Sequence, residues 1–224
     1  MKLVIGNKNY SSWSLRPWIA MKALGIAFEE ILIPFGTPLG NPDFKARLAA
    51  YTPAGLVPVL IDGDVHVWET LAIMEYLAEK FPDKRLWPAD AKARAHARAI
   101  SSEMHAGFSA LRGECPMNIR RPIRERALSD AAQANVRRIE ELWGEARAKY
   151  GGPFLFGKFG AADAMYAPVV ARLNTYGVKV GREARAYMEA VMALPAWAEW
   201  RKGALAESWI VPEDEADWPT VLSA

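Results

Sequence analysis

Three short polar groupings in the sequence carry side chains that could bind or activate a small molecule. The first is Ser11-Ser12-Trp13-Ser14, which separates a short apolar run from a stretch with helical periodicity. Serine hydroxyls and free N–H groups at a helix N-terminus stabilise an anion, a thiolate included, and they also cap the helix. The spacing leaves open which hydroxyl, that of Ser11, Ser12 or Ser14, would face a ligand.

The second and third groupings are Val57-Pro58 and Glu69-Thr70. Proline at the start of an apolar strand indicates a sheet edge or a special bend, and a cis peptide bond is one form of such a bend. A cis bond would turn the N–H and C=O of Val57 sideways, where they can pair with an extended peptide. Glu69-Thr70 opens a helical pattern. The pair either caps that helix or holds both charged ends of a zwitterionic amino acid.

Several other chemistries lack the residues they require. The sequence contains no GxGxxG, GxxxxGK[ST] or GxSxG motif. His66, His96 and His105 are scattered without metal-ligand spacing, so no metal site is expected. The single cysteine, Cys115, permits no internal disulfide and is expected to be an ordinary free thiol.

Net charge and hydropathy indicate which kinds of partner and which cellular compartment to expect. The formal net charge of +2, from 28 Lys and Arg against 26 Asp and Glu, is too small to indicate a nucleic acid or a membrane surface. No segment approaches the apolar length of a membrane span or a signal peptide. We therefore expect no membrane partner, and a cytoplasmic location with reducing conditions.

The elements that must position these groups alternate over the first 82 residues. Apolar runs predict strands at 2–6, 28–33, 56–61 and 65–68. Helical periodicity is found at 15–24, from about residue 43, and at 70–81. Asp62-Gly63-Asp64 between two apolar runs predicts a tight hairpin. The order β-α-β-α-β-β-α predicts an α/β domain over residues 1–82.

The composition changes after this domain. Prolines and aspartates mark a linker at 83–89, and alanine-rich helical stretches follow at 90–112, 124–149, 161–175, 182–193 and 195–206. These predict an all-helical domain over residues 90–224. Met104 and Phe108 share one face of the first stretch and His105 flanks it, so they either pack in the core or form a hydrophobic substrate wall. The basic run 120–126 is expected to be a solvated surface.

Taken together, the polar groupings and their flanks resemble a known family. SSWSLRPWIAMKALG, TPAGLVPVLIDGD and WETLAIMEYLAEKFP resemble the N-terminal thioredoxin-like domain of cytosolic glutathione S-transferases. FLFGKFGAADAMYAPVVARL resembles the family's helical-domain signature, in which Asp163 matches a residue that helps to cap a core helix. The resemblance implies glutathione as co-substrate, a site between the two domains, and a homodimer.

The resemblance also implies roles for the polar residues. Ser11 matches the catalytic serine of the zeta- and theta-like classes. Val57 matches the residue whose main chain pairs with the cysteine of glutathione, ahead of the family's cis-proline at Pro58. Glu69 and Thr70 match the pair that binds the γ-glutamyl end of glutathione.

One departure from the family pattern bears on the reaction. Trp13 stands where the zeta and beta classes carry cysteine, which counts against a cysteine-based thiol transfer and against zeta-type isomerisation. Trp13, Met104, His105 and Phe108 are the expected electrophile pocket. The expected function is a detoxifying glutathione transferase that conjugates the glutathione thiolate to a small hydrophobic electrophile. A zeta-type isomerase and a non-catalytic interaction module are the alternatives.

Overall fold

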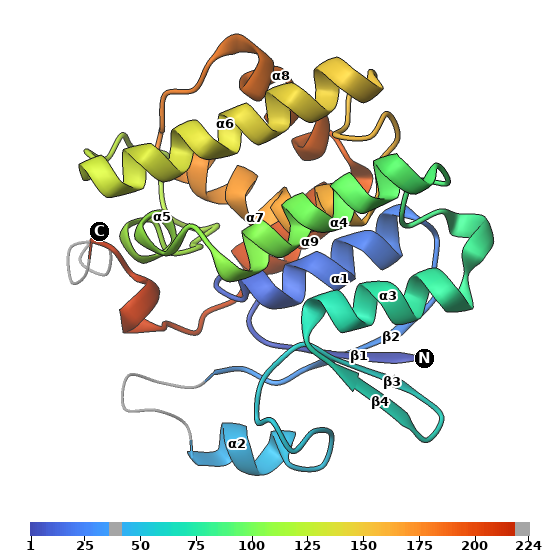
Figure 1. Ribbon diagram of the computed structural model, residues 1–224. Helices are drawn as coiled ribbons and strands as arrows, with labels where there is room; N and C mark the ends of the chain where they lie inside the picture. Colours follow the sequence, from blue (N-terminus) through green and yellow to red (C-terminus); the bar gives the residue numbers. More distant parts are fainter. Residues whose placement is uncertain (36–41, 218–224) are drawn as a thin grey trace.

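The computed structural model describes residues 1–35 and 42–217, and its N-terminal part is built on a mixed four-stranded sheet (Figure 1). The strands have the order β2-β1-β3-β4. β1 pairs parallel with β2 and antiparallel with β3, and β3 pairs antiparallel with β4. Their bounds are β1 Lys2–Ile5, β2 Glu29–Leu32, β3 Val59–Asp62 and β4 Val65–Trp68. The predicted hairpin is confirmed, with Gly63 in the left-handed region at φ +65°.

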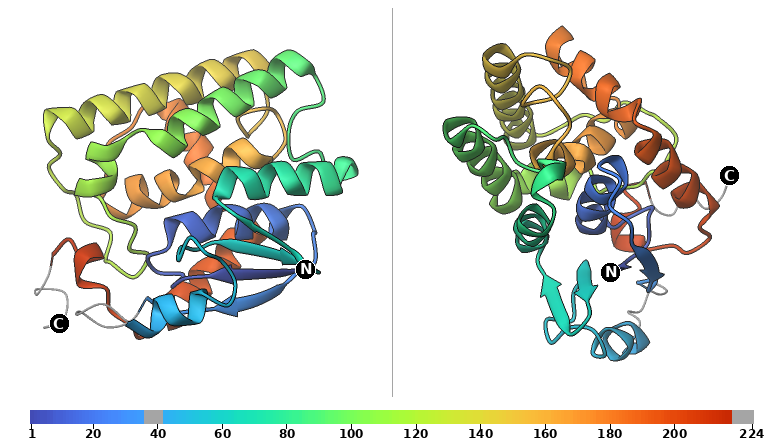
Figure 2. Two further views of the ribbon diagram at one scale, coloured as in Figure 1. Left: turned by 60° about the horizontal axis from the view of Figure 1, so that its bottom comes forward. Right: turned by 90° about the vertical axis from the view of Figure 1, so that its right-hand side faces the viewer.

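Three helices belong to this sheet domain: α1 Ser12–Ala23, α2 Pro42–Leu48 and α3 Thr70–Lys80. The expected β-α-β-α-β-β-α order is therefore confirmed. α1 lies between the sheet and the C-terminal helices (Figures 1 and 2). Its side chains Leu15, Trp18 and Ile19 are fully buried, because helices cover the face of α1 that points away from the sheet.

α1 begins earlier than the sequence indicated. Ser11 is its N-cap and accepts a hydrogen bond from the Ser14 N–H, so the helix starts at Ser12 rather than at residue 15. Pro17 consequently lies beyond the first turn. Because proline has no N–H, the carbonyl of Trp13 lacks its usual partner four residues on. The Thr70 hydroxyl donates to that carbonyl instead, at 3.4 Å.

The C-terminal part is mostly helical, as expected. Its helices are α4 Ala91–Ala106, α5 Ser109–Glu114, α6 Asp130–Tyr150, α7 Ala161–Thr175, α8 Arg182–Met192 and α9 Pro195–Ala206. Two short 3-10 turns, η1 Pro82–Lys84 and η2 Pro212–Asp214, precede and follow them. No helix in the described ranges combines the length and the apolar character that crossing a membrane requires.

The single helix predicted at 90–112 is in fact two helices. α4 ends before Gly107, where a Cβ would lie 2.7 Å from the Glu103 carbonyl oxygen. Phe108 then adopts a left-handed conformation at φ +59°, which redirects the chain into α5. The next helix starts at Asp130 rather than at 124, because the chain before it is irregular.

The basic run 120–126 is only in part the solvated surface that was expected: Arg124 is exposed, whereas Arg120 and Arg121 are bound by other parts of the fold. Arg121 is 4% exposed and donates to the carbonyl of Thr175 and to the carboxylate of Asp217. Arg120 donates to the Tyr10 hydroxyl and to the Trp209 carbonyl, each at 2.6 Å. For these two residues the prediction was wrong because the carbonyls and carboxylates that bind their guanidinium groups come from distant parts of the chain.

Candidate functional site

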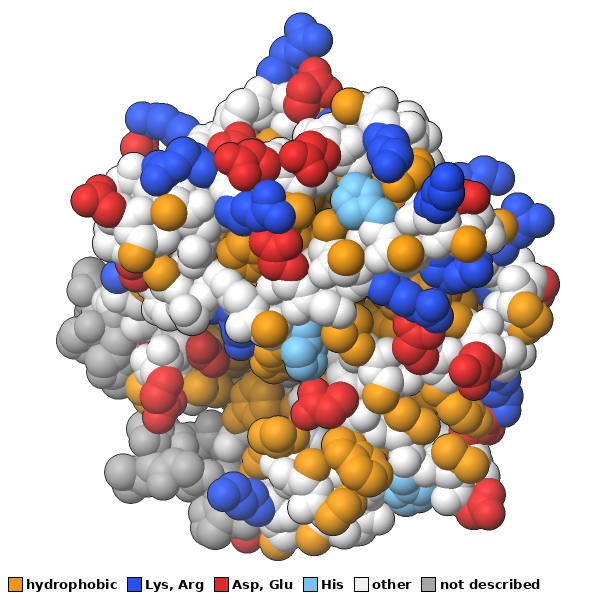
Figure 3. All heavy atoms as spheres, viewed as in Figure 1, with side chains coloured by type: hydrophobic (Ala, Val, Ile, Leu, Met, Phe, Trp, Pro, Cys, Tyr) orange, Lys and Arg blue, Asp and Glu red, His pale blue; other side chains and the backbone are white. Residues whose placement is uncertain are grey.

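Two adjoining pockets lie between the sheet domain and the helical domain. The larger has a volume of about 560 Å³ and the smaller about 240 Å³. Both are lined by Trp13, Leu56 and Val57, so these residues form their common wall. On the face seen in Figure 3, the surface is hollowed between the two parts of the molecule, and hydrophobic side chains lie within the hollow.

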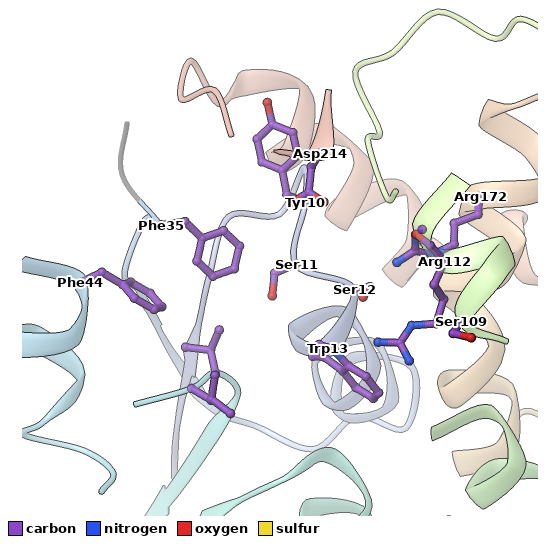
Figure 4. Close-up of a pocket in the computed structure, with 13 residues that line it drawn as sticks. Tyr10, Ser11, Ser12, Trp13, Phe35, Phe44, Ser109, Arg112, Arg172 and Asp214 are labelled. Carbon is purple, nitrogen blue, oxygen red and sulfur yellow. The ribbon is translucent and has the colours of Figure 1, made fainter. Parts of the chain in front are cut away.

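Ser11 lines the larger pocket and its hydroxyl points into it (Figure 4). Its Oγ lies 2.7 Å from Ser14 Oγ and accepts from the Ser14 N–H at 3.3 Å. In this structure the Ser11 hydroxyl donates to Ser14 Oγ. Because a hydroxyl proton can rotate and Ser14 also carries one, the pair can reverse, so that Ser14 donates to Ser11 and Ser11 donates to a ligand. The N-terminus of α1 adds positive potential at the same place.

Ser12 and Ser14 are placed differently from Ser11. Ser14 is fully buried, lines neither pocket, and accepts a hydrogen bond from the Gly6 N–H at 3.1 Å. Ser12 lines the larger pocket but its hydroxyl faces the helical side, near Arg112 (Figure 4). The three serines that sequence spacing left equivalent are therefore distinguished by tertiary structure.

The smaller pocket brings together the other two polar groupings. It is lined by Val57, Pro58, Glu69 and Thr70. The Val57–Pro58 bond is cis, as expected. Val57 precedes Val59, where β3 begins to pair, so its backbone N–H and C=O lie outside the strand pairing.

Glu69 has features of a ligand-binding residue rather than of a helix cap. Although it occupies the N-cap position of α3, its side chain makes no capping hydrogen bond. Its backbone is in the left-handed region at φ +69°, a conformation that costs a non-glycine residue about 1–3 kcal/mol. The carboxylate, whose side chain is 54% exposed, is thus available at the pocket.

His105 connects α4 to the smaller pocket, which it lines. Its Nε2 lies 3.9 Å from Glu69 Oε2, and its ring meets the Trp13 ring edge to face at 5.0 Å. Met104 and Phe108, by contrast, are 1% and 7% exposed, belong to the hydrophobic core, and line neither pocket. Met104 continues the buried face of α4 formed by Ala97 and Ile100, and Phe108 packs in the core directly after the break at Gly107.

Other residues form the wall that Met104 and Phe108 were expected to provide. The remaining lining of the larger pocket comes from Tyr10, Phe35, Phe44, Ser109, Arg112, Gly113, Arg172 and Asp214. Sequence reasoning missed them. Arg172 had a detectable signal, since it is a charged residue that follows the apolar run Ala167–Ala171 within α7. Asp214 had none, because only the return of the chain after α9 brings it to the pocket.

The lone thiol and the acidic residues suggest no further chemistry within the described ranges. Cys115 is buried, and desolvation raises the pKa of its thiol to about 11, so the thiol is protonated and unreactive at neutral pH. Residues 1–35 and 42–217 contain no group of three or more His, Cys, Asp and Glu side chains arranged to hold a metal ion.

Comparison with known proteins identifies the family. Residues 10–80 match the glutathione S-transferase N-terminal domain and residues 124–203 match the glutathione S-transferase C-terminal domain. The chain is 31% identical over 189 residues to glutathione S-transferase F14 of Arabidopsis thaliana, which covers 77% of this chain and 72% of that protein.

Two further similarities concern enzymes named as isomerases. A probable maleylacetoacetate isomerase of Caenorhabditis elegans is 38% identical over 101 residues, which is 45% of this chain and only 44% of that protein. The holo structure of maleyl pyruvate isomerase, a bacterial zeta-class enzyme, superposes with a TM-score of 0.69 at 23% identity, covering 94% of this chain and 100% of that one. The two domain matches and the similarity to the Arabidopsis enzyme show that the chain belongs to the glutathione S-transferase family.

Proposed function

We propose that this protein binds glutathione in the smaller pocket and conjugates its thiolate to an electrophile in the larger one. The observation that carries the proposal is the position of Ser11: its hydroxyl, at the N-terminus of α1, opens into the larger pocket beside the wall that both pockets share. A thiol held at that wall meets a hydroxyl donor on one side and an open cavity on the other.

In this proposal each polar grouping contacts a different part of glutathione. The free N–H and C=O of Val57 pair with the cysteinyl main chain. Glu69 binds the γ-glutamyl ammonium, and the N–H of Thr70 at the start of α3 binds the γ-glutamyl carboxylate. Solved structures of the same fold contain bound glutathione, which supports this assignment of the ligand.

The reaction then depends on the state of the sulfur. A free thiol has a pKa of about 8.5, so only a few per cent is thiolate at pH 7. A hydrogen bond from the Ser11 hydroxyl and the field of the α1 N-terminus both favour the thiolate. The thiolate attacks the electrophilic carbon, the carbon–sulfur bond forms, and the leaving group departs with its electron pair.

The test is retention on immobilised glutathione followed by a conjugation assay with 1-chloro-2,4-dinitrobenzene. We expect elution by free glutathione and a conjugation rate well above the uncatalysed rate. A folded protein that is retained but conjugates no activated electrophile would instead be a non-catalytic glutathione-binding module. A folded protein that is not retained would contradict the proposal as a whole.

Isomerisation is the second candidate, and it rests on the similarity to the nematode maleylacetoacetate isomerase. Trp13 occupies the position at which the zeta string has cysteine, and it fills the wall between the two pockets. Conjugation therefore remains the better supported activity. An assay of cis–trans isomerisation of maleylacetoacetate with catalytic glutathione separates the two candidates.

The proposed enzyme is a homodimer located in the cytoplasm. Leu56 and Trp68 are 59% and 41% exposed and both line the smaller pocket, so apolar surface lies at its edge, which favours a homodimer. Sedimentation at micromolar concentration tests it, and a monomer would contradict it. A single cysteine that forms no disulfide agrees with a cytoplasmic enzyme that detoxifies electrophiles.

A further inference from the structure

The larger pocket carries an excess of positive charge that a purely hydrophobic electrophile would not use. Two arginines, Arg112 of α5 and Arg172 of α7, line it, and Asp214 is its one acidic lining residue among those described. A third guanidinium, that of Arg16 in α1, lies directly behind the pocket wall, 4.0 Å from the centre of the Trp13 ring.

Two of these arginines are held by the fold. Arg16 is 1% exposed and donates to the carbonyls of Met165 and Ser12. Arg172 is 7% exposed and donates to the carbonyls of Arg112 and Cys115. Neither forms an ion pair with any described carboxylate, so their charges are left without a direct counter-charge.

The guanidinium of Arg112 is free to bind a ligand. It lies 4.9 Å from the centre of the Trp13 ring, on the pocket side (Figure 4). Within residues 1–35 and 42–217, its side chain makes neither a hydrogen bond nor an ion pair. Arg112 is half-buried, and its donors face the cavity that also holds the Ser11 hydroxyl.

The three charges affect one another's pKa. Burial and then the charge of Arg112 lower the pKa of Arg172 to about 10. Burial followed by the charges of Arg172 and Arg112 lowers the pKa of Arg16. Asp214 offsets one of the three positive charges, and burial raises its pKa to about 6, so it is largely ionised at neutral pH. Positive charge remains in excess at the pocket.

We propose that Arg112 binds a carboxylate of the electrophile, so that the preferred substrates of this protein are anionic electrophiles. A guanidinium offers two parallel N–H donors to a carboxylate, and such a charged pair is stronger where water is partly excluded. The contact of the Arg112 guanidinium with the Trp13 ring restricts where its donors lie in the pocket. The proposal deepens the proposed conjugation and rests on it.

The test compares 4-chloro-3-nitrobenzoate with 4-chloro-3-nitrobenzamide, two electrophiles of nearly equal shape that differ in charge. Each kcat/KM is divided by the uncatalysed rate with glutathione, which removes the difference in intrinsic reactivity. We expect the wild-type protein to prefer the carboxylate by about tenfold or more. Arg112→Met should lower the corrected kcat/KM for the carboxylate about tenfold more than that for the amide, and Arg112→Lys should keep part of the preference.

Arg98→Met is the matched control. The Arg98 guanidinium also lies over an indole, 5.8 Å from the Trp87 ring, but it pairs with Glu75 outside both pockets. We expect this variant to keep the wild-type preference. Equal losses on both electrophiles in Arg112→Met, or a rise in the KM for glutathione with either one, would overturn the proposal. The second result would mean that Arg112 binds a carboxylate of glutathione itself.

Calorimetric binding of the two glutathione conjugates distinguishes this proposal from the proposed function. Tighter binding of the carboxylate conjugate, lost in Arg112→Met, supports the anion site even if turnover is absent. Conjugation of both electrophiles at equal corrected rates would leave the transferase function standing and overturn the anion site. A folded protein that binds neither conjugate would overturn both.

Discussion

At the scale of single residues, Ser11 has two roles that one substitution tests together. Its hydroxyl caps α1 and faces the larger pocket. Ser11→Ala should lower the free energy of unfolding by about 1 kcal/mol through loss of the cap. It should also move the pH–rate profile of conjugation to higher pH, because less of the bound thiol is ionised. If the thiol pKa rises by about one, the rate at neutral pH falls by up to about tenfold, the full factor applying when the pKa lies above the assay pH.

The control for this prediction is Ser12→Ala. Ser12 lines the same pocket, but its hydroxyl neither caps the helix nor points toward the shared wall. We expect a wild-type pH profile and wild-type binding of glutathione. A shifted profile in Ser12→Ala with an unshifted one in Ser11→Ala would move the thiol-activating role by one residue.

Glu69 gives the second prediction at this scale. Glu69→Gln keeps the size of the side chain but removes the charge that we assign to the γ-glutamyl ammonium. The KM for glutathione should rise about tenfold, which corresponds to one lost charged hydrogen bond, and the KM for the electrophile should change little. Glu75→Gln, on the exposed face of α3 and paired with Arg98, is the control. Equal rises in both KM values would indicate a role in shaping the cleft instead.

At the scale of elements, the start of α7 depends on one buried carboxylate. Asp163 is 1% exposed and accepts from the N–H groups of Leu155 and Gly160 at 3.0 and 2.9 Å. The backbone at Gly160 passes so close to Leu86 that a Cβ would lie 2.7 Å from the Leu86 carbonyl oxygen. This approach accounts for glycine at the N-cap and leaves Asp163 as the capping side chain.

Asp163→Ala should therefore lower the free energy of unfolding by about 2–5 kcal/mol, because it leaves two backbone N–H groups without a partner. Asp163→Asn should cost less, since its amide oxygen still accepts one bond. Asp130→Ala, which also alters the first turn of a helix but at an exposed position, should cost only a few tenths of a kcal/mol. Urea unfolding of the three variants measures these differences. Similar losses at both aspartates would refute the capping role of Asp163.

At the scale of the whole molecule, the segment after α9 joins the two domains beside the larger pocket. The Glu207 carboxylate accepts from the N–H groups of Lys8 and Asn9. The Tyr10 hydroxyl donates to Glu215 and accepts from Arg120. Since Tyr10 and Asp214 line the pocket, this network determines the shape of its outer wall.

Arg120→Met should loosen residues 207–217 and leave the glutathione pocket intact. We expect faster limited proteolysis of this segment and a several-fold rise in the KM for the electrophile, with the glutathione KM unchanged, because only the larger pocket borders the segment. Arg124→Met, an exposed arginine of the same basic run, should behave as the wild type. Unchanged proteolysis in Arg120→Met would show that the other contacts are enough to hold residues 207–217 in place.

The sequence by itself determined the order of the elements and the three polar groupings. Alternating apolar runs, the Asp-Gly turn and the helical stripes are local signals, because each depends on residues a few positions apart. The groupings Ser11–Ser14, Val57-Pro58 and Glu69-Thr70 were singled out for a related reason. Each lies at or near the start of a predicted element, where backbone groups are left unpaired. The choice of Ser11 among the serines came from the resemblance to the family.

The tertiary structure alone decided which serine faces the cavity and which residues line it. Ser11 and Ser14 differ through contacts with Gly6 and with the pocket, and spacing does not encode those contacts. Met104 lies in the core because it continues the buried face of α4, and Arg112 lines the pocket that Met104 was expected to line. The charge of that wall arises where α1, α5 and α7 converge. Convergence of segments distant in sequence depends on how whole faces pack, so no local pattern could have predicted it.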